Sequence, residues 1–270
     1  MRFLNGADLA GYMKERQARQ VRGLRQAAHV FPRLAIILTD EHPASLKYIQ
    51  LKQKYGEDIL VDVVVEQVSV DQAITTIERH NQDPLTHGTI VQLPIADPSQ
   101  TDAVLRAIAP EKDVDGLGSN QFFDPATPTA ILWLMAGYNI EPRAKKVVVI
   151  GQGRLVGTPL VRMLQDSGVE PIIANRHSDL VKVCEDADII ITATGHPGLL
   201  TSDIIPQKAV VIDAGVAGEG GVLKGDVADD VYTTRDDLTI TPQKGGVGPL
   251  TVIALFDAVI RAARRVAENR

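Results

Sequence analysis

Cysteine is almost absent from this chain of 270 residues, because Cys184 is the only one. A single cysteine excludes an internal disulfide and any metal centre built from a cysteine cluster. The chain also lacks an excess of basic residues: 34 Asp and Glu residues outnumber 28 Lys and Arg residues, which gives a formal net charge of −6. That balance disfavours a general nucleic-acid-binding protein.

Long apolar runs are missing as well. No segment approaches the roughly 20 apolar residues of a membrane-spanning helix, and the N-terminus lacks the apolar core of a signal peptide. We therefore expect a cytoplasmic protein with no membrane partner. The composition, 44% hydrophobic and 23% charged, is that of a folded globular protein. Its length allows one large domain or two ordinary ones, each with its own core.

A glycine-rich turn lies near the middle of the chain. Four apolar residues at 147–150 predict a buried strand, and Gly151, Gly153 and Gly157 come next, before an apolar helical pattern. Glycine is also common in ordinary turns, but a strand before it and a helix after it favour a dinucleotide-binding unit. In such a unit Gly151 permits the turn, Gly153 lets the backbone approach a pyrophosphate, and Gly157 allows close packing. The spacing to Gly157 is one residue longer than in the commonest fingerprint.

Apolar strands and helical patterns alternate along the chain, which predicts parallel βαβ units and an α/β fold. A proline-rich stretch at 125–128 marks the expected crossing between two domains. We predict strands at 33–38, 61–65, 88–93, 147–150, 171–174, 187–193 and 209–214. We predict helices at 7–30, 70–82, 101–109, 129–137 and 250–267, another beginning at 44, and a helical pattern through Val161 and Leu164 after the glycines.

One helix carries side chains suited to chemistry. Ser45, Tyr48 and Lys52 recur at i, i+3 and i+7, so they share one helix face. A solvated surface stripe is the simpler interpretation, because most helical lysines are exposed. Other segments favour a site. Gln92 ends a strand where a cleft opens in α/β folds, and the loop after the next helix carries carboxylates at Asp113 and Asp115.

Four of these segments together resemble the methylenetetrahydrofolate dehydrogenase/cyclohydrolase family over nearly the whole chain. They are the helix at 43–52, the strand at 88–94, the loop Pro-Glu-Lys-Asp-Val-Asp-Gly at 110–116, and Gly-Gly-Val-Gly-Pro-Leu-Thr at 245–251. The resemblance implies an N-terminal α/β substrate domain, a Rossmann-like parallel-sheet cofactor domain, and a C-terminal helix that returns to the first domain. We expect the folate-binding domain to comprise 1–124 plus 249–270, and the cofactor domain 125–248.

The resemblance also implies site roles. Lys52 would be the general acid and base, because a partly desolvated cleft lowers the proton affinity of an amine. Gln92 would orient that amine, Tyr48 would offer a flat surface to the substrate, and Asp115 would accept two N–H donors of a pterin. We interpret Asp113 as a loop residue. The implied catalytic residues are Lys52, Tyr48, Gln92 and Asp115, and the implied substrate-binding residues are Ser45, Tyr48, Gln92, Asp115, Gly248 and Pro249.

The cofactor prediction rests on the residues at the carboxyl ends of the strands in the second domain. The family's usual Gly-Arg-Ser is replaced by Gly-Gln-Gly at 151–153, and no acidic residue ends the strand before Arg176. Arg176 could instead receive a 2′-phosphate, so we predict NADP, with NAD as the alternative. The expected cofactor-binding residues are Gly151, Gln152, Gly153, Gly157, Arg176, Thr194, Gly195 and Val216.

The implied function is bifunctional: oxidation of 5,10-methylenetetrahydrofolate, and then hydrolysis of the methenyl product to 10-formyltetrahydrofolate. The resemblance implies a homodimer in one-carbon metabolism and purine biosynthesis. The histidines lack a ligand spacing, so we predict no metal. Two alternatives are weighed against this function. A quinate- or shikimate-type dehydrogenase could share the two-domain plan, but it would not be expected to combine Tyr48, Lys52, Gln92 and the 245–251 loop. Loss of Lys52 would favour a noncatalytic folate- or nucleotide-binding protein, and Lys52 is present.

Overall fold

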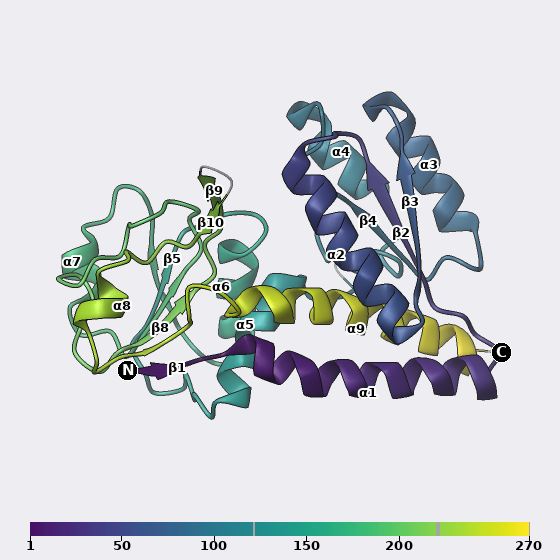
Figure 1. Cartoon of the computed structure of the whole chain (residues 1–270). Helices are drawn as coiled ribbons and strands as arrows, with labels where there is room; N and C mark the ends of the chain where they lie inside the picture. The colour runs from purple at the N-terminus through teal and green to yellow at the C-terminus, as the bar shows by residue number, and fades with distance from the viewer. Residues whose placement is uncertain (121, 220–221, 270) are drawn as a thin grey trace. The chain divides into compact units, whose positions relative to one another are not determined.

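The computed structural model describes residues 1–120, 122–219 and 222–269, and the chain forms two compact units (Figure 1). One unit contains Gly11–Ala126 and the chain from Val252 onward, and we call it the three-stranded unit after its sheet. The other contains Met1–Ala10 and Thr127–Thr251, and we call it the six-stranded unit. Each unit is therefore assembled from segments that are distant in the sequence.

The three-stranded unit is built on a parallel sheet with the strand order β3-β2-β4. The central strand is buried along almost its whole length, which explains why its sequence is continuously apolar. Pro94 lacks an N–H and cannot extend the sheet, so the ladder stops after the Gln92 N–H donates to the Ile37 carbonyl (2.9 Å). The elements are β2 (Arg33–Leu38), α2 (Pro43–Ile59), β3 (Asp62–Gln67), α3 (Val70–Gln82), β4 (Gly88–Val91), η1 (Pro98–Gln100) and α4 (Thr101–Arg106).

The six-stranded unit contains a parallel sheet with the order β1-β11-β8-β7-β5-β6. The order reverses at β5, since β6 lies on one side of it and β7 on the other. The strands are β1 (Arg2–Phe3), β5 (Val147–Ile150), β6 (Ile172–Ala174), β7 (Ile189–Thr192), β8 (Val210–Asp213) and β11 (Thr239–Ile240). The same part of the chain contains one antiparallel strand pair, β9 (Ala217–Glu219) and β10 (Val222–Lys224). It also contains four helices: α5 (Ala126–Gly137), α6 (Gly157–Asp166), α7 (Leu180–Cys184) and α8 (Val231–Thr234).

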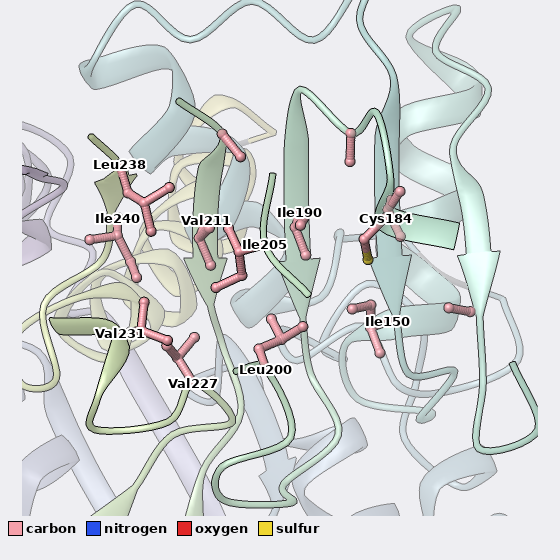
Figure 2. Packing of buried hydrophobic residues seen from close by; sticks show 14 residues of the cluster. Ile150, Cys184, Ile190, Leu200, Ile205, Val211, Val227, Val231, Leu238 and Ile240 are labelled. Atoms are coloured by element: carbon pink, nitrogen blue, oxygen red, sulfur yellow. The ribbon is translucent and has the colours of Figure 1, made fainter. Parts of the chain in front are cut away.

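One core of the six-stranded unit lies on a single face of its sheet (Figure 2). Ile150, Ile190 and Val211 project from neighbouring strands and meet side chains from the segments that cover this face. Cys184 of α7 belongs to this core, and burial raises the pKa of its thiol to about 11. The lone cysteine is therefore a packed apolar residue and not a reactive one.

The two longest helices lie near the two ends of the sequence: α1 (Gly6–Ala27) and α9 (Val247–Glu268). Within the three-stranded unit the buried Gln17 side chain of α1 donates to the Ile253 carbonyl of α9 (2.9 Å) and accepts from the Tyr55 hydroxyl of α2 (2.7 Å). The Tyr55 ring packs on Phe256 with 4.9 Å between centroids. The C-terminal helix thus returns to the first unit, as predicted.

The predicted α/β class and two-domain plan are confirmed. The strand at 33–38, the helix at 70–82 and the strand at 147–150 have the predicted bounds. The sequence analysis missed β1, β11 and the β9–β10 pair, which are two or three residues long. No helix in the described part of the chain is long and apolar enough to cross a membrane.

Candidate active site and dinucleotide site

The predicted helix face is part of α2, whose first helical residue is Pro43. Proline suits this position because its missing N–H is one that a helix start leaves unpaired anyway. Ser45 is buried, Lys52 is partly buried, and Tyr48 remains 37% exposed. Partial burial raises the pKa of the Tyr48 hydroxyl. The face is therefore not a uniformly solvated stripe.

Lys52 and Gln92 form the polar centre of this face. The Lys52 ammonium donates to Gln92 Oε1 (2.9 Å), and Gln92 Nε2 donates to the Leu93 carbonyl (3.0 Å). The second bond fixes the amide orientation, because the nitrogen end is committed to a carbonyl and the oxygen end must face the lysine. Gln92 itself is buried at the end of β4.

Asp115 acts electrostatically on the same lysine. Burial lowers the pKa of Lys52, and the negative charge of Asp115 opposes that shift in part. Burial raises the pKa of the Asp115 carboxyl, and Lys52 opposes it in turn. An amine with a lowered pKa can release and recover a proton closer to neutral pH than an exposed lysine can.

Asp113 organises the loop that carries Asp115, in agreement with its interpretation as a loop residue. Its carboxylate is buried and accepts from the Gly116 N–H (3.1 Å) and the Gly118 N–H (2.7 Å). Gly116 has a φ of 64°, a conformation that disfavours other residue types. Asp113 thus holds the loop and does not contribute to the Lys52 centre.

Two further residues that the sequence analysis did not single out position this loop. The Lys112 ammonium donates to three carbonyls at the end of α3, those of His80 (2.7 Å), Asn81 (2.9 Å) and Asp83 (2.7 Å). At Gly88 an added Cβ would lie 2.8 Å from both methyl groups of Val114. The only sequence signal for either residue was its position inside a motif.

The second candidate site lies at the carboxyl edge of the six-stranded sheet. Ile150 is in register with Ala174 on one side and Thr192 on the other, and Thr192 with Asp213. The loops after these strands carry most of the predicted cofactor-binding residues. In an open parallel sheet, ligands bind outside the carboxyl ends of the strands where the order reverses, and here that point is β5.

The glycine loop after β5 is tightly packed at two of its glycines and open beside the third. Gly151 has a φ of 99°, and a Cβ there would lie 2.7 Å from the Ala193 carbonyl oxygen. A Cβ on Gly157 would meet the Gly151 carbonyl oxygen at 1.9 Å. Gly153 has open space beside it, since an added Cβ would have no atom of a described residue other than its two chain neighbours within 4 Å, and Gln152 is exposed. The backbone is therefore closely packed at Gly151 and Gly157, and space is open beside Gly153.

Arg176 lies in a short turn after β6. The Asn175 side chain accepts from the His177 N–H (2.9 Å), and the Asn175 N–H donates to the Ser178 hydroxyl oxygen (3.0 Å). Arg176 is exposed, and its Nε donates to His177 Nε2 (3.1 Å). The turn thus holds a cation at the same sheet edge as the glycine loop. The sequence analysis missed Asn175 and Ser178, whose signal was their Asn-x-x-Ser turn spacing.

The remaining predicted residues lie in two places. Thr194 and Gly195 come after β7, and a Cβ on Gly195 would lie 3.4 Å from the Val216 carbonyl oxygen. Val216 comes after β8 and is 54% exposed, so these loops meet at one edge. Gly248 and Pro249 lie in the first turn of α9 and belong to the six-stranded unit, whereas Lys52 belongs to the other. Among the described residues no group of three or more His, Cys, Asp or Glu side chains could hold a metal ion.

Comparison with known proteins gives a consistent result along the chain. Residues 4–115 match the model of the tetrahydrofolate dehydrogenase/cyclohydrolase catalytic domain, and residues 125–267 match that of its NAD(P)-binding domain. The bifunctional protein FolD of Streptococcus thermophilus is 35% identical over 279 residues, covering 97% of this chain and 98% of that protein.

Solved structures agree. The bifunctional methylenetetrahydrofolate dehydrogenase/cyclohydrolase FolD of Campylobacter jejuni superposes with a TM-score of 0.92 at 30% identity, covering 98% of this chain and 99% of that one. The Trypanosoma brucei methylenetetrahydrofolate dehydrogenase-cyclohydrolase, solved with NADP and an inhibitor, superposes with a TM-score of 0.90 at 26% identity and covers 97% of each chain.

Proposed function

Since the chain belongs to the tetrahydrofolate dehydrogenase/cyclohydrolase family, we propose that it oxidises 5,10-methylenetetrahydrofolate with NADP and hydrolyses the methenyl product to 10-formyltetrahydrofolate. The observation that supports this most is the pairing of a partly desolvated amine, Lys52, with Gln92 at 2.9 Å and with the charge of Asp115. A noncatalytic folate-binding protein would need the carboxylate but not a lysine with a lowered pKa.

Dehydrogenation requires above all that the methylene carbon of the folate be aligned with the nicotinamide. Hydride leaves the methylene carbon, and the two folate nitrogens that flank it stabilise the resulting cation. Asp115 would accept the paired N–H donors of the pterin, and Tyr48 would pack against the ring, so that the methylene carbon is held in place. The nicotinamide, when bound, supplies the hydride acceptor.

The hydrolysis needs a proton carrier. Water adds to the methenyl carbon and loses a proton. The N5 nitrogen then gains a proton, the carbon–N5 bond breaks, and the new hydroxyl loses its remaining proton to become the formyl oxygen on N10, so one proton is released overall. Lys52 would accept the first proton as a base and return one as an acid. Gln92 would hold the amine in place without adding a charge that keeps it protonated.

The residues at the edge of the six-stranded sheet fit a dinucleotide. Gly151 and Gly157 close the turn, and the open space beside Gly153 leaves room for a pyrophosphate. Thr194, Gly195 and Val216 would flank the nicotinamide half. Arg176 would bind the 2′-phosphate, which supports NADP over NAD because no acidic residue ends β6. We also propose a homodimer, which analytical ultracentrifugation tests.

The experiment supplies methylenetetrahydrofolate with NADP or NAD and monitors the reduced cofactor and the methenyl product separately. The variant Lys52→Gln should lose about a hundred- to ten-thousandfold in methenyl hydrolysis while part of the dehydrogenation survives. Lys54→Gln is the matched control, because Lys54 lies on the same helix and is 70% exposed. Hydrolysis near the original rate in folded Lys52→Gln protein would refute the role of Lys52.

A further inference from the structure

A fully buried carboxylate lies beneath the loop after β7. Asp226 has no exposed surface. Its Oδ2 accepts from the Thr192 hydroxyl (2.6 Å) and the Thr194 N–H (2.7 Å), and its Oδ1 accepts from the His196 N–H (2.8 Å). The two backbone donors flank Gly195, so one side chain fixes the loop on both sides of a predicted dinucleotide-contacting residue.

A second carboxylate fixes the backbone of the first. Asp213, the last residue of β8, accepts at Oδ1 from the Asp226 N–H (3.1 Å) and the Gly215 N–H (2.9 Å). Its Oδ2 accepts from the Val227 N–H (2.9 Å). These contacts form a chain of support. β8 positions Asp213, the Asp213 carboxylate positions the backbone at 226–227, and the Asp226 carboxylate positions the loop at 194–196.

A glycine lies directly against each of the two carboxylates. An added Cβ on Gly215 would lie 2.1 Å from Asp226 Oδ1, and one on Gly225 would lie 2.1 Å from Asp213 Oδ2. A side chain at either glycine would therefore collide with a carboxylate oxygen. The loop after β8, which leads to Val216, is therefore packed against the same carboxylate that holds the loop after β7.

From this geometry we propose that Asp226 is a positioning residue of the dinucleotide site. It holds the 194–196 loop, and Asp213 holds Asp226. The inference rests on the proposed function, since it concerns the loops assigned to the dinucleotide. Charge-assisted hydrogen bonds from backbone N–H groups are strong and directional, so one buried carboxylate can define the shape of the loop.

Asp226→Asn is the direct test, because asparagine has the same shape but presents an NH₂ group to donors that need an acceptor. We expect the KM for NADP or NAD to rise about ten- to a hundredfold, in line with the loss of one to two charged hydrogen bonds. Methenyl hydrolysis consumes no dinucleotide. Its rate should therefore stay within about twofold, which also shows that the protein is folded.

Asp237→Asn is the matched control. Asp237 also accepts from a backbone N–H, that of Lys208 (2.7 Å), but these residues precede β11 and β8 and so lie at the opposite edge of the sheet. This variant should lose stability with an unchanged KM for the dinucleotide. Two substitutions of Thr192 give a smaller, graded change. Thr192→Val removes one of the three donors to Asp226 and should raise the dinucleotide KM less than Asp226→Asn does. Thr192→Ser keeps the hydroxyl, so its dinucleotide KM should equal that of the unmodified protein.

The outcomes separate the inference from the proposed function. Unmodified protein that binds neither NADP nor NAD by titration calorimetry would overturn both. Dinucleotide binding without folate chemistry would overturn the proposed function alone, and calorimetric affinities of the same variants would then decide the inference. An unchanged dinucleotide KM in Asp226→Asn, or parallel changes in Asp226→Asn and Asp237→Asn, would overturn the positioning role. If Asp226→Asn fails to fold, equal KM values for Thr192→Val and Thr192→Ser would overturn it.

Discussion

Replacing Gln92 by glutamate tests the proposed proton carrier through its neighbour. In the structure a neutral oxygen accepts from the Lys52 ammonium at 2.9 Å, and the lysine pKa is lowered by burial. A carboxylate at the same place would stabilise the charged lysine. The variant should therefore keep Lys52 protonated to a higher pH and withhold the free amine that hydrolysis needs.

The distance between Lys52 Nζ and Gln92 Oε1 sets the size of the expected rise in the Lys52 pKa. Two unit charges 2.9 Å apart attract by roughly 6 kcal/mol at an effective dielectric constant of about 20. Since each pKa unit corresponds to about 1.4 kcal/mol, the upper bound is a rise of about four units. Lys52 is only partly buried, so water screens the pair and a rise of about one to two units is the working expectation.

The assay is the pH dependence of methenyl hydrolysis, measured as kcat/KM. The acidic limb of this profile reports the essential base of the free enzyme, and it should move upward in Gln92→Glu. Gln92→Met is the matched control, because it removes the acceptor without adding a charge and so should move the limb downward. Dehydrogenation should change far less in either variant, since hydride transfer needs no proton carrier.

Gln92→Glu and Gln92→Met should shift the acidic limb of the pH profile in opposite directions. Limbs that move in the same direction, or that do not move, would show that the titrating group is not Lys52 or that Gln92 does not face it in solution. A loss of folate affinity without any change of the pH profile would make Gln92 a substrate contact alone.

Three further predictions concern other parts of the chain. Arg176→Ala should weaken NADP binding about ten- to a hundredfold more than NAD binding, and equal losses by calorimetry would show a shared contact. Burial raises the pKa of Asp213 to about 6 from 3.8, so this residue contributes stability that is complete below about pH 3.8 and is lost as pH rises through about 6. Relative to Asp213→Asn, the original protein should thus gain roughly 2–3 kcal/mol of unfolding free energy between about pH 7 and pH 4, and parallel stability curves would contradict this. Gly88→Ala should cost about 1–3 kcal/mol by pressing on Val114 and should raise the folate KM in both activities, whereas Gly23→Ala, where an added Cβ meets nothing, should leave the KM unchanged.

Runs of apolar residues in the sequence correctly predicted buried strands, because a strand that is buried along its length consists of neighbouring apolar residues. The run at 147–150 is apolar because β5 is buried along its length, and the 33–38 run reflects the central place of β2. The hydrogen bond between Lys52 and Gln92 joins residues 40 positions apart, and only the family resemblance suggested it. Periodicity identifies the helix and the strand that carry these side chains, but it cannot show that the strand end faces the helix.

The parts that escaped prediction depend on distant partners. β1 is only two residues long and exists because the Arg2 N–H donates to the Leu238 carbonyl (2.8 Å). Asp226 looks like an ordinary loop aspartate beside a glycine, and its importance arises from donors at least 30 positions earlier in the chain. Lys112 likewise caps a helix that ends 30 residues before it. No window of sequence contains such pairs.

The return of α9 to the three-stranded unit has a consequence for synthesis on the ribosome. Everything in the six-stranded unit has been translated once Thr251 is added, whereas the three-stranded unit still lacks its last helix. Until then the Gln17 amide has no Ile253 carbonyl to bind, and the Tyr55 ring has no Phe256 to pack on. The three-stranded unit, most of which (Gly11–Ala126) emerges before the bulk of the other unit, therefore completes its fold last. A chain that ends at residue 251 and is released from the ribosome should leave this unit open to proteases and chaperones while the other can fold.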